Sequence, residues 1–262
     1  MSKLTDRFDA ICTRMAEAAR ASGRAPSSVQ LVAVSKFHGA DMITELALHW
    51  AEKSFEAGKP VFGESYMQEA RDKMPEAASL LSGKGNRPEM SWHFVGHVQS
   101  KKAKDVIGQF DLIHSVDSLK LADALHKAWQ TRVASRPVGL DEAAPPSQAV
   151  LIQVNVGREP QKSGIDPERL EELVAGIAAM PGLSLRGLMC LPPVAEIGES
   201  SRPYFIMLRE LRDRVEKQTG ASLPELSMGM SDDFEAAIEE GATLVRIGTD
   251  IFGPRTPEAV SQ

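Results

Sequence analysis

Eight short apolar runs, separated by longer segments, constrain the fold of this chain more than any other feature. They cover residues 31–35, 61–63, 91–95, 111–115, 149–156, 183–190, 225–229 and 243–248. All but the last are followed by a segment with helical periodicity, which is typical of βα units and a parallel sheet. Eight such units predict a single (β/α)8 TIM barrel of the α/β class. A doubly wound open sheet is the alternative, because periodicity does not distinguish a closed sheet from an open one.

The N-terminal segment predicts an extra helix that precedes the barrel. Four apolar residues within residues 1–23 recur at helical spacing and form one stripe: Leu4, Phe8, Ile11 and Met15. We expect one domain over residues 1–262, with the barrel at about 31–253 and a flexible tail at 254–262. Stretches rich in Gly, Pro or Ser predict loops at residues 82–90, 136–148 and 191–203.

Composition argues against several classes of function. Thirty Lys and Arg against thirty-six Asp and Glu give a net charge of −6, so no global field draws the chain to nucleic acid or an anionic membrane. Cys12 and Cys190 are the only cysteines, too few for a disulfide framework, and they fit a reducing compartment. No apolar stretch reaches the roughly 18 residues that a membrane span needs. We expect a cytoplasmic protein and, since no sustained heptad indicates an interface, a monomer.

One lysine stands at the end of the first predicted strand. Strand alternation places Val32, Val34 and Lys36 on one face, so Lys36 enters the C-terminal mouth of the barrel if the valines fill its interior. A desolvated lysine there becomes a nucleophilic amine that forms a Schiff base with an aldehyde or ketone. The alternative is a lysine at a strand end that reaches solvent.

The segment after the seventh predicted strand is the first of two glycine turns. Residues 227–238 run from a strand through a glycine into a helix, so backbone N–H groups near Met230 and Ser231 would lie at a positive helix end. This arrangement predicts a phosphate site. The alternative is a simple helix cap, because Asp232 and Glu235 have the spacing of a capping box.

The second glycine turn follows the eighth predicted strand. Gly248 lets the backbone approach a ligand closely, and the Thr249 hydroxyl can donate a hydrogen bond. Phosphate sites of α/β barrels frequently lie in the loops after strands seven and eight, where both glycine turns fall.

Arg246 lies on the eighth strand and shares a face with Leu244 and Gly248. A guanidinium that points into the barrel is a buried cation and needs an acceptor. The ring nitrogen of a cofactor would serve, and a permanently charged arginine there would keep a pyridine nitrogen unprotonated. An ion pair with a carboxylate is the alternative.

Other polar residues carry weaker signals. His93 and His97 have the spacing of a two-histidine metal site, but a glycine and a strand interrupt the helix that such a site needs, so polar pocket walls are favoured. Asn155 is either a pocket residue or a turn former. For Lys162 and Ser163 a solvated loop is favoured over a site. The chain has no Walker A motif, Rossmann fingerprint, G-x-S-x-G or paired Cys-x-x-Cys motif.

Nine motifs in order resemble the pyridoxal 5′-phosphate homeostasis proteins, the YggS/PROSC family. They are LVAVSK, FGES, WHFVGHVQSKK, LIHSVDS, QVNV, KSGI, GLMCLPP, LSMGMSDDFEAAI and VRIGTDIFG, which together extend from about residue 31 to residue 253. The resemblance implies a one-domain version of the fold-type III barrel of alanine racemases. It also implies that pyridoxal 5′-phosphate (PLP) is held as an internal aldimine.

The resemblance assigns roles to individual residues. It implies an aldimine on Lys36, a phosphate site near Ser231, Gly248 and Thr249, and a ring nitrogen near Arg246, in agreement with the roles argued from the residues themselves. Two further motif positions, His93 and Asn155, would line the mouth. The family usually has asparagine in its FGEN motif, where this chain has Ser65, and a hydroxyl retains part of that hydrogen bonding.

The function implied is non-catalytic binding of PLP, which stores or buffers the aldehyde, takes part in vitamin B6 homeostasis and delivers PLP to the apo-forms of PLP-dependent enzymes. A racemase needs acid–base groups on both faces of its substrate, and the only tyrosines, Tyr66 and Tyr204, are not evident partners. A PLP-dependent racemase of narrow or weak activity is the alternative. A Schiff-base aldolase without a cofactor is a third reading.

Overall fold

The computed structural model describes residues 2–53, 58–82, 88–135, 146–193, 196 and 198–254. Parts of the loops predicted at 82–90, 136–148 and 191–203 lie outside the described residues, as does nearly all of the tail predicted at 254–262.

Eight parallel strands form a closed barrel in which each strand pairs with its neighbours in sequence order. The strands are β1 Gln30–Val34, β2 Val61–Glu64, β3 Ser91–Phe94, β4 Leu112–Val116, β5 Gln148–Val154, β6 Leu183–Cys190, β7 Glu225–Ser227 and β8 Leu244–Ile247. Closure occurs between β1 and β8, where Val32 lies opposite Arg246 in the register. The predicted TIM barrel is therefore confirmed, and the open sheet is not formed.

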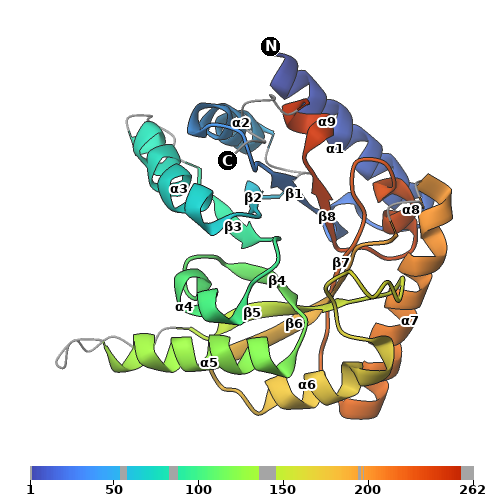
Figure 1. The fold of residues 1–262 in the computed structure, drawn as a ribbon. Coiled ribbons are helices and arrows are strands. Elements are labelled where there is room, and N and C mark those ends of the chain that lie inside the picture. The colour runs from blue at the N-terminus through green and yellow to red at the C-terminus, as the bar shows by residue number, and fades with distance from the viewer. Residues whose placement is uncertain are drawn as a thin grey trace.

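Helices surround this barrel (Figure 1), and they follow the strands in the expected alternation. They are α1 Lys3–Ala21, α2 Ala40–Glu52, α3 Met67–Ser82, α4 Ala103–Val106, α5 Leu119–Ala134, α6 Leu170–Ala178, α7 Arg202–Thr219, α8 Phe234–Glu239 and α9 Thr249–Phe252. No helix in the described part of the chain is both long and apolar enough to cross a membrane.

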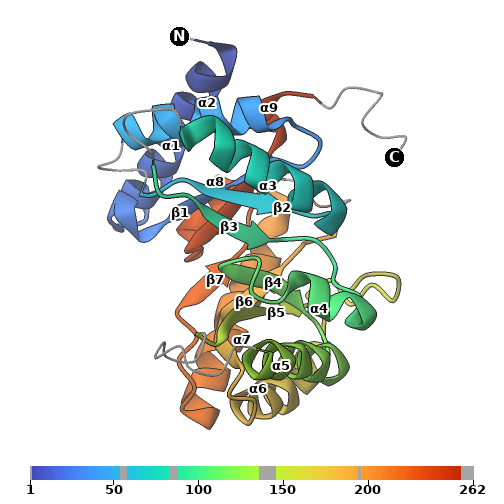
Figure 2. The ribbon, with the colours of Figure 1, turned by 90° about the vertical axis from the view of Figure 1, so that its left-hand side faces the viewer.

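The predicted N-terminal helix is present as α1. The Ser2 hydroxyl caps it by accepting from the Thr5 N–H, and the helix ends at Ala21, close to the expected end near Gly23. The predicted apolar stripe is its buried face. This face packs against α8 and α9, so the first helix lies beside the two helices that end the described chain (Figures 1 and 2).

Two apolar cores stabilise the barrel. The larger one fills the layer between strands and helices, and it includes the fully buried Phe8, Trp50 and Phe205. The smaller one lies inside the barrel and consists of Val32, Val61, Leu112, Leu151, Met189 and Leu244. Polar side chains share the barrel interior with this small cluster, which is unusual because burial of a polar group costs free energy unless it is hydrogen-bonded.

Candidate functional site at the C-terminal mouth of the barrel

A cavity of about 340 Å³ opens at the C-terminal ends of the strands. Its volume lies in the range of small-molecule sites, and its position is the one at which α/β barrels carry their chemistry. The structure brings seven of the nine predicted site residues to its walls: Lys36, Ser65, Met230, Ser231, Arg246, Gly248 and Thr249.

Lys36 follows β1 and is held by an unusual backbone. The next residue, Phe37, has a φ of 67°, a left-handed conformation that non-glycine residues rarely adopt. The Phe37 N–H donates to Glu69 Oε1 at 2.5 Å, which fixes the chain on the C-terminal side of Lys36. Such local strain persists only where the surrounding structure enforces it.

A cluster of Glu64, Glu69 and Lys73 fixes the chain on the N-terminal side of Lys36, and in this cluster Glu64 and Lys73 are buried. Lys73 donates to the Ser35 carbonyl oxygen at 2.8 Å and to Glu64 Oε1 at 2.9 Å, and it also pairs with Glu69. The Ser35 hydroxyl donates to Glu64 Oε1 at 2.7 Å. Burial raises the pKa of Glu64, whereas Lys73 and Ser35 lower it. This acid–lysine cluster therefore holds both neighbours of Lys36.

Arg246 enters the cavity from β8, and its side chain is only 5% exposed. Its Nη1 donates to the Ser227 hydroxyl at 2.6 Å and its Nη2 to the Cys190 carbonyl oxygen at 2.9 Å. Neither acceptor is charged, so the expected alternative of an ion pair with a carboxylate is not what the described residues form. Burial lowers the pKa of Arg246, and Asp233 is a nearby carboxylate that raises it.

The turn after β7 requires a glycine. Gly229 has a φ of +90°, and a Cβ there would lie 2.6 Å from the Ala237 Cβ. The Met230 N–H donates to Asp233 Oδ1 at 2.7 Å. The amide of Met230 is therefore already used within the protein, contrary to the prediction that it points out to a phosphate. Ser231 lines the cavity without that constraint.

The capping box that was the alternative reading for the start of α8 does not form. The N-cap residue is Asp233 rather than Asp232, and its side chain makes no cap bond to the helix because it holds the Met230 amide. Glu235 instead forms an ion pair with Arg14 of α1 at 2.5 Å. Two adjacent aspartates allow two helix registers, and tertiary contacts select the second.

The turn after β8 brings Gly248 close to the end of β1. A Cβ on Gly248 would lie 3.1 Å from the Val34 carbonyl oxygen, a tight contact that a glycine avoids. Thr249 is the first residue of α9 and lines the cavity. Its amide therefore lies at the positive end of a short helix, on the same wall as Gly248.

Sequence reasoning missed His38, Asp232 and Leu191, which also line the cavity. The His38 ring stacks on Phe252 with ring centroids 4.9 Å apart. Strand alternation does not reveal this histidine, because β1 ends at Val34 and the left-handed Phe37 interrupts the extended backbone before residue 38. The other two stand on loops, where no period exists.

Two predicted site residues do not line this cavity. His93 lies deeper in the barrel, beside a pocket at the opposite, N-terminal mouth. The Asn155 amide accepts from the Glu159 N–H at 3.2 Å and donates to the Glu159 carbonyl at 3.0 Å, so it closes a loop. For Asn155 the turn-former alternative describes the structure.

The loop after β5 contacts two neighbouring loops. Lys162 pairs with Glu159 at 2.7 Å and donates to the Pro192 carbonyl oxygen at 3.1 Å. Ser163 lies 3.1 Å from His97 Nδ1. These contacts connect the loops after β3, β5 and β6. Lys162 and Ser163 are partly exposed and do not line the cavity, so the favoured reading of a loop rather than a site stays a prediction.

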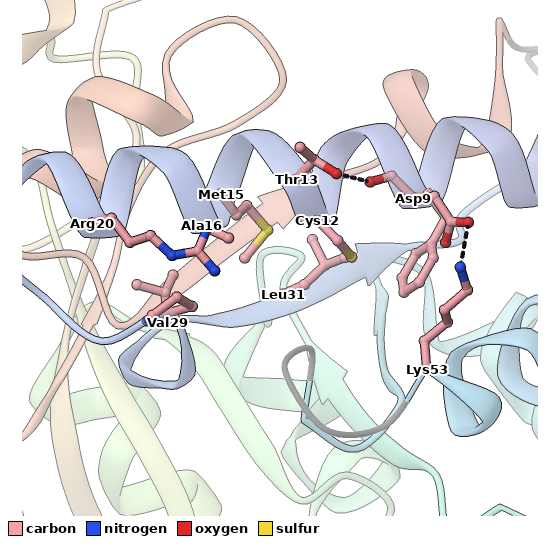
Figure 3. Close-up of a pocket in the computed structure, with 11 residues that line it drawn as sticks. Asp9, Cys12, Thr13, Met15, Ala16, Arg20, Val29, Leu31 and Lys53 are labelled. Carbon is pink, nitrogen blue, oxygen red and sulfur yellow. Dashed lines mark hydrogen bonds and ion pairs between the residues drawn. The ribbon is translucent and has the colours of Figure 1, made fainter.

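A larger cavity of about 440 Å³ lies between α1 and β1, away from Lys36 (Figure 3). Cys12 points from α1 toward Leu31 in this view, and an ion pair of Asp9 and Lys53 at 3.0 Å lies at one end. Burial raises the pKa of the Cys12 thiol to about 12, so it is neutral at physiological pH and a poor nucleophile. Lys36 and the buried Arg246 line the smaller cavity instead.

Comparison with known proteins identifies the family. Residues 9–256 match the family model of the alanine racemase N-terminal domain. The pyridoxal phosphate homeostasis protein of Pseudomonas aeruginosa is 40% identical over 255 residues, which cover 97% of each chain. The protein of the same name from Aquifex aeolicus is 38% identical over 251 residues, 95% of this chain and 97% of the relative. This chain belongs to the pyridoxal phosphate homeostasis protein family. The resemblance seen in its motifs is thereby confirmed.

Solved structures agree with this family. PipY of Synechococcus elongatus, a structure with PLP bound, is 31% identical with a TM-score of 0.72, and the match covers 95% of this chain and 100% of PipY. Alanine racemase from Corynebacterium glutamicum is 16% identical with a TM-score of 0.61, and the match covers 94% of this chain and 61% of the racemase. The second likeness shows the fold alone.

Proposed function

We propose that this protein binds PLP at the C-terminal mouth of its barrel, with the PLP aldehyde joined to Lys36 as a Schiff base. One observation carries the proposal. A lysine, a buried arginine and two glycine turns, argued separately from the sequence, line a single cavity of about 340 Å³. The family membership and the PLP-bound structure of PipY support the choice of ligand.

The walls of the cavity fit such a ligand. Ser231, Gly248 and Thr249 would hold the phosphate, since hydroxyls and amides at a helix start favour an anion. Arg246 would face the ring nitrogen, because its guanidinium bonds only neutral acceptors on the protein side. Met230 and the Ser65 hydroxyl would complete the wall.

We infer that the protein carries PLP rather than transforming amino acids. PLP supplies a reactive aldehyde and an electron-withdrawing ring. An arginine at the ring nitrogen keeps that nitrogen unprotonated and weakens the ring as an electron sink. Neither Tyr66 nor Tyr204 lines the cavity, which argues against either as the second base that a racemase needs. Reversible binding at Lys36 would buffer PLP and release it to apo-enzymes, which is a homeostatic role.

The setting proposed for this role is a cytoplasmic, monomeric protein of one domain. Cys12 and Cys190 are both free thiols, which fits a reducing compartment. The β1–β8 pairing joins the two ends of the chain in one barrel, which supports a single domain. Sedimentation equilibrium tests the monomer.

The proposed delivery of PLP needs a contact with an apo-enzyme. The exposed Met230 lies at the cavity wall, where an apo-enzyme would meet it.

The decisive experiment is an absorption spectrum of the purified protein between roughly 300 and 500 nm, before and after borohydride reduction, with mass mapping of the modified lysine. We expect a visible band, and a reduced adduct on Lys36 alone. Lys36→Ala should abolish the adduct, whereas Lys162→Ala, a lysine on a loop at the same end of the barrel, should retain it. A colourless protein that takes up no added PLP would overturn the proposal.

A second measurement separates the carrier from an enzyme. Amino acids incubated with the PLP-loaded protein in deuterated water should keep their Cα protons. Exchange that is lost in Lys36→Ala would instead favour the alternative, a PLP-dependent racemase of narrow activity.

A further inference from the structure

A line of hydrogen-bonded side chains crosses the interior of the barrel from one mouth to the other. His93 Nδ1 lies 3.0 Å from His114 Nε2, and His114 Nδ1 lies 2.9 Å from the Ser227 hydroxyl. Ser227 in turn accepts from Arg246 Nη1 at 2.6 Å. His114 and Ser227 are fully buried, and His93 is 8% exposed. Four strands, β3, β4, β7 and β8, thus contribute one member each.

The direction of these hydrogen bonds follows from their chemistry. Arginine can only donate, so the Ser227 oxygen accepts from Arg246. The hydroxyl proton of Ser227 then has His114 Nδ1 as its acceptor, and His114 Nε2–H donates to His93 Nδ1. The reverse order would leave the buried Ser227 proton without an acceptor among the described residues. Both histidines are therefore neutral and carry their proton on Nε2.

This order has an electrostatic consequence for Arg246. Each member of the chain presents its acceptor toward the guanidinium and its donor away from it, so the dipoles of Ser227, His114 and His93 align to stabilise the positive charge. Burial lowers the pKa of His93 to about 4, and it lowers the pKa of His114 well below its usual value, which agrees with two neutral rings. A charged ring at either position would repel Arg246.

The chain also fixes the orientation of the guanidinium. Ser227 and the Cys190 carbonyl each accept one N–H from different terminal nitrogens, so the planar group cannot rotate without breaking one of them. The three other N–H groups of Arg246 remain for the side that lines the cavity.

We propose that His93, His114 and Ser227 are positioning residues for PLP: an oriented hydrogen-bond chain that holds Arg246 and aims its remaining donors at the ring of the bound cofactor. The inference rests on the proposed function, because it takes PLP as the occupant of the cavity. It extends the site through the barrel to three residues that do not line the cavity.

The first test uses the unliganded wild-type protein. Long-range ¹H–¹⁵N NMR spectra distinguish the tautomers of each histidine. We expect His93 and His114 to carry the proton on Nε2. A proton on Nδ1 of either ring would reverse the chain and overturn the proposal, whether or not PLP binds.

The second test measures PLP affinity by absorbance titration. Ser227→Ala removes the link between His114 and Arg246, and we expect about tenfold weaker binding, the cost of losing a hydrogen bond to a charged group. Ser91→Ala is the matched control. It also removes a buried strand hydroxyl, but this hydroxyl donates to Asp111 and is not part of the line from His93 to Arg246. The Ser91→Ala variant should bind PLP as the wild type does. His114→Phe, which keeps a ring without nitrogens, should weaken binding as Ser227→Ala does.

The outcomes separate this inference from the proposed function. A wild-type protein that binds no PLP would overturn both. A wild type that binds PLP, together with Ser227→Ala and His114→Phe variants that are folded by circular dichroism and bind it equally well, would overturn the inference and leave the proposed function standing. If Ser227→Ala does not fold, the tautomers of the wild type still decide the question.

Discussion

Lys73 occupies a site that few lysines occupy, because its side chain is only 6% exposed. Its three N–H groups are fully used by the Ser35 carbonyl, Glu64 and Glu69. Two carboxylates beside one ammonium are stable in a buried place only while that cation remains. The conformation of the backbone beside Lys36 therefore depends on a side chain that does not line the cavity.

Replacement of this cation should be strongly destabilising. Lys73→Met keeps the length of the side chain but leaves Glu64 and Glu69 without their partner. We expect the free energy of unfolding to fall by about 3–5 kcal/mol, the cost of breaking a buried ion pair from one side. Urea denaturation followed by circular dichroism measures this change.

A surface lysine provides the control for this substitution. Lys127 pairs with Asp123 at 2.6 Å on the exposed face of α5, so Lys127→Met should change stability by less than about 0.5 kcal/mol. Equal losses in the two variants would contradict the role assigned to the acid–lysine cluster.

Residues differ in how far the sequence reveals them. Lys36 and Arg246 could be predicted because strand alternation places every second residue inside a barrel. Lys73 could not, since a lysine on an amphipathic helix is normally solvated and only the contact of α3 with β1 and β2 buries it. The family resemblance implied that His93 lines the mouth that holds Lys36, whereas His93 lies beside the pocket at the opposite end of the barrel. A motif match does not give the depth of a residue along the barrel axis.

Among the elements, the short turns after β7 and β8 do most to shape the cavity. Gly229 lies in the first of them at a φ of +90°, and α8 packs directly over it. Ala237 and Phe234 of that helix occupy the space in which a side chain would stand. A larger residue would move α8 and, with it, Ser231.

Gly229→Ala should therefore lower the free energy of unfolding by more than the cost of a left-handed alanine alone. A left-handed alanine costs about 1 kcal/mol, and overpacking adds about 1–3 kcal/mol. We expect a loss of about 2–4 kcal/mol in urea denaturation together with weaker PLP binding. The overpacking arises because the added Cβ would lie only 2.6 Å from the Ala237 Cβ.

Gly220 is the matched control because it has a similar φ of +72° but no heavy atom within 4 Å of an added Cβ. Gly220→Ala at the end of α7 should lose only about 1 kcal/mol and leave PLP affinity unchanged. If both glycine variants lose the same stability, crowding at Gly229 is not the cause.

Element positions were predicted well for strands and less well for helix starts. All eight strands were predicted within two residues at either end, because each apolar run is short and bounded by turn residues. At the start of α8 the capping-box alternative selected Asp232, whereas the N-cap is the adjacent Asp233, and local rules do not separate the two. The function of Asp233 depends on the Met230 amide, a contact fixed by the turn rather than by helix capping.

The whole molecule combines a closed sheet with a polar interior. Pairing of β1 with β8 closes the sheet, and the hydrogen-bond chain from His93 to Arg246 links four strands across its centre. The closed topology was predictable from the count of eight repeats. The line of hydrogen bonds from His93 to Arg246 could not be predicted, because its members are distant in sequence and no local pattern connects them.

This interior makes the stability of the molecule depend on pH. A histidine whose pKa in the folded state is lowered binds its proton more readily when the chain is unfolded, so its contribution to stability is lost as the pH falls. For His93 the range runs from about 6.5, the ordinary value, to about 4. Burial raises the pKa of Glu64 and of Asp233, which acts in the opposite direction at acid pH.

Comparison of the wild type with His93→Gln isolates the contribution of this histidine, because the carboxylates are common to both. Asp111 and Lys59 are the charged groups that act on His93, and they are also unchanged. Between pH 6.5 and pH 4 the free energy of unfolding of the wild type should fall more steeply, by up to about 1.4 kcal/mol per pH unit, the free energy of one pKa unit. Urea denaturation at half-unit intervals of pH measures both curves. Parallel curves would show that folding does not change the pKa of His93, and they would contradict the lowered pKa that burial of this ring predicts.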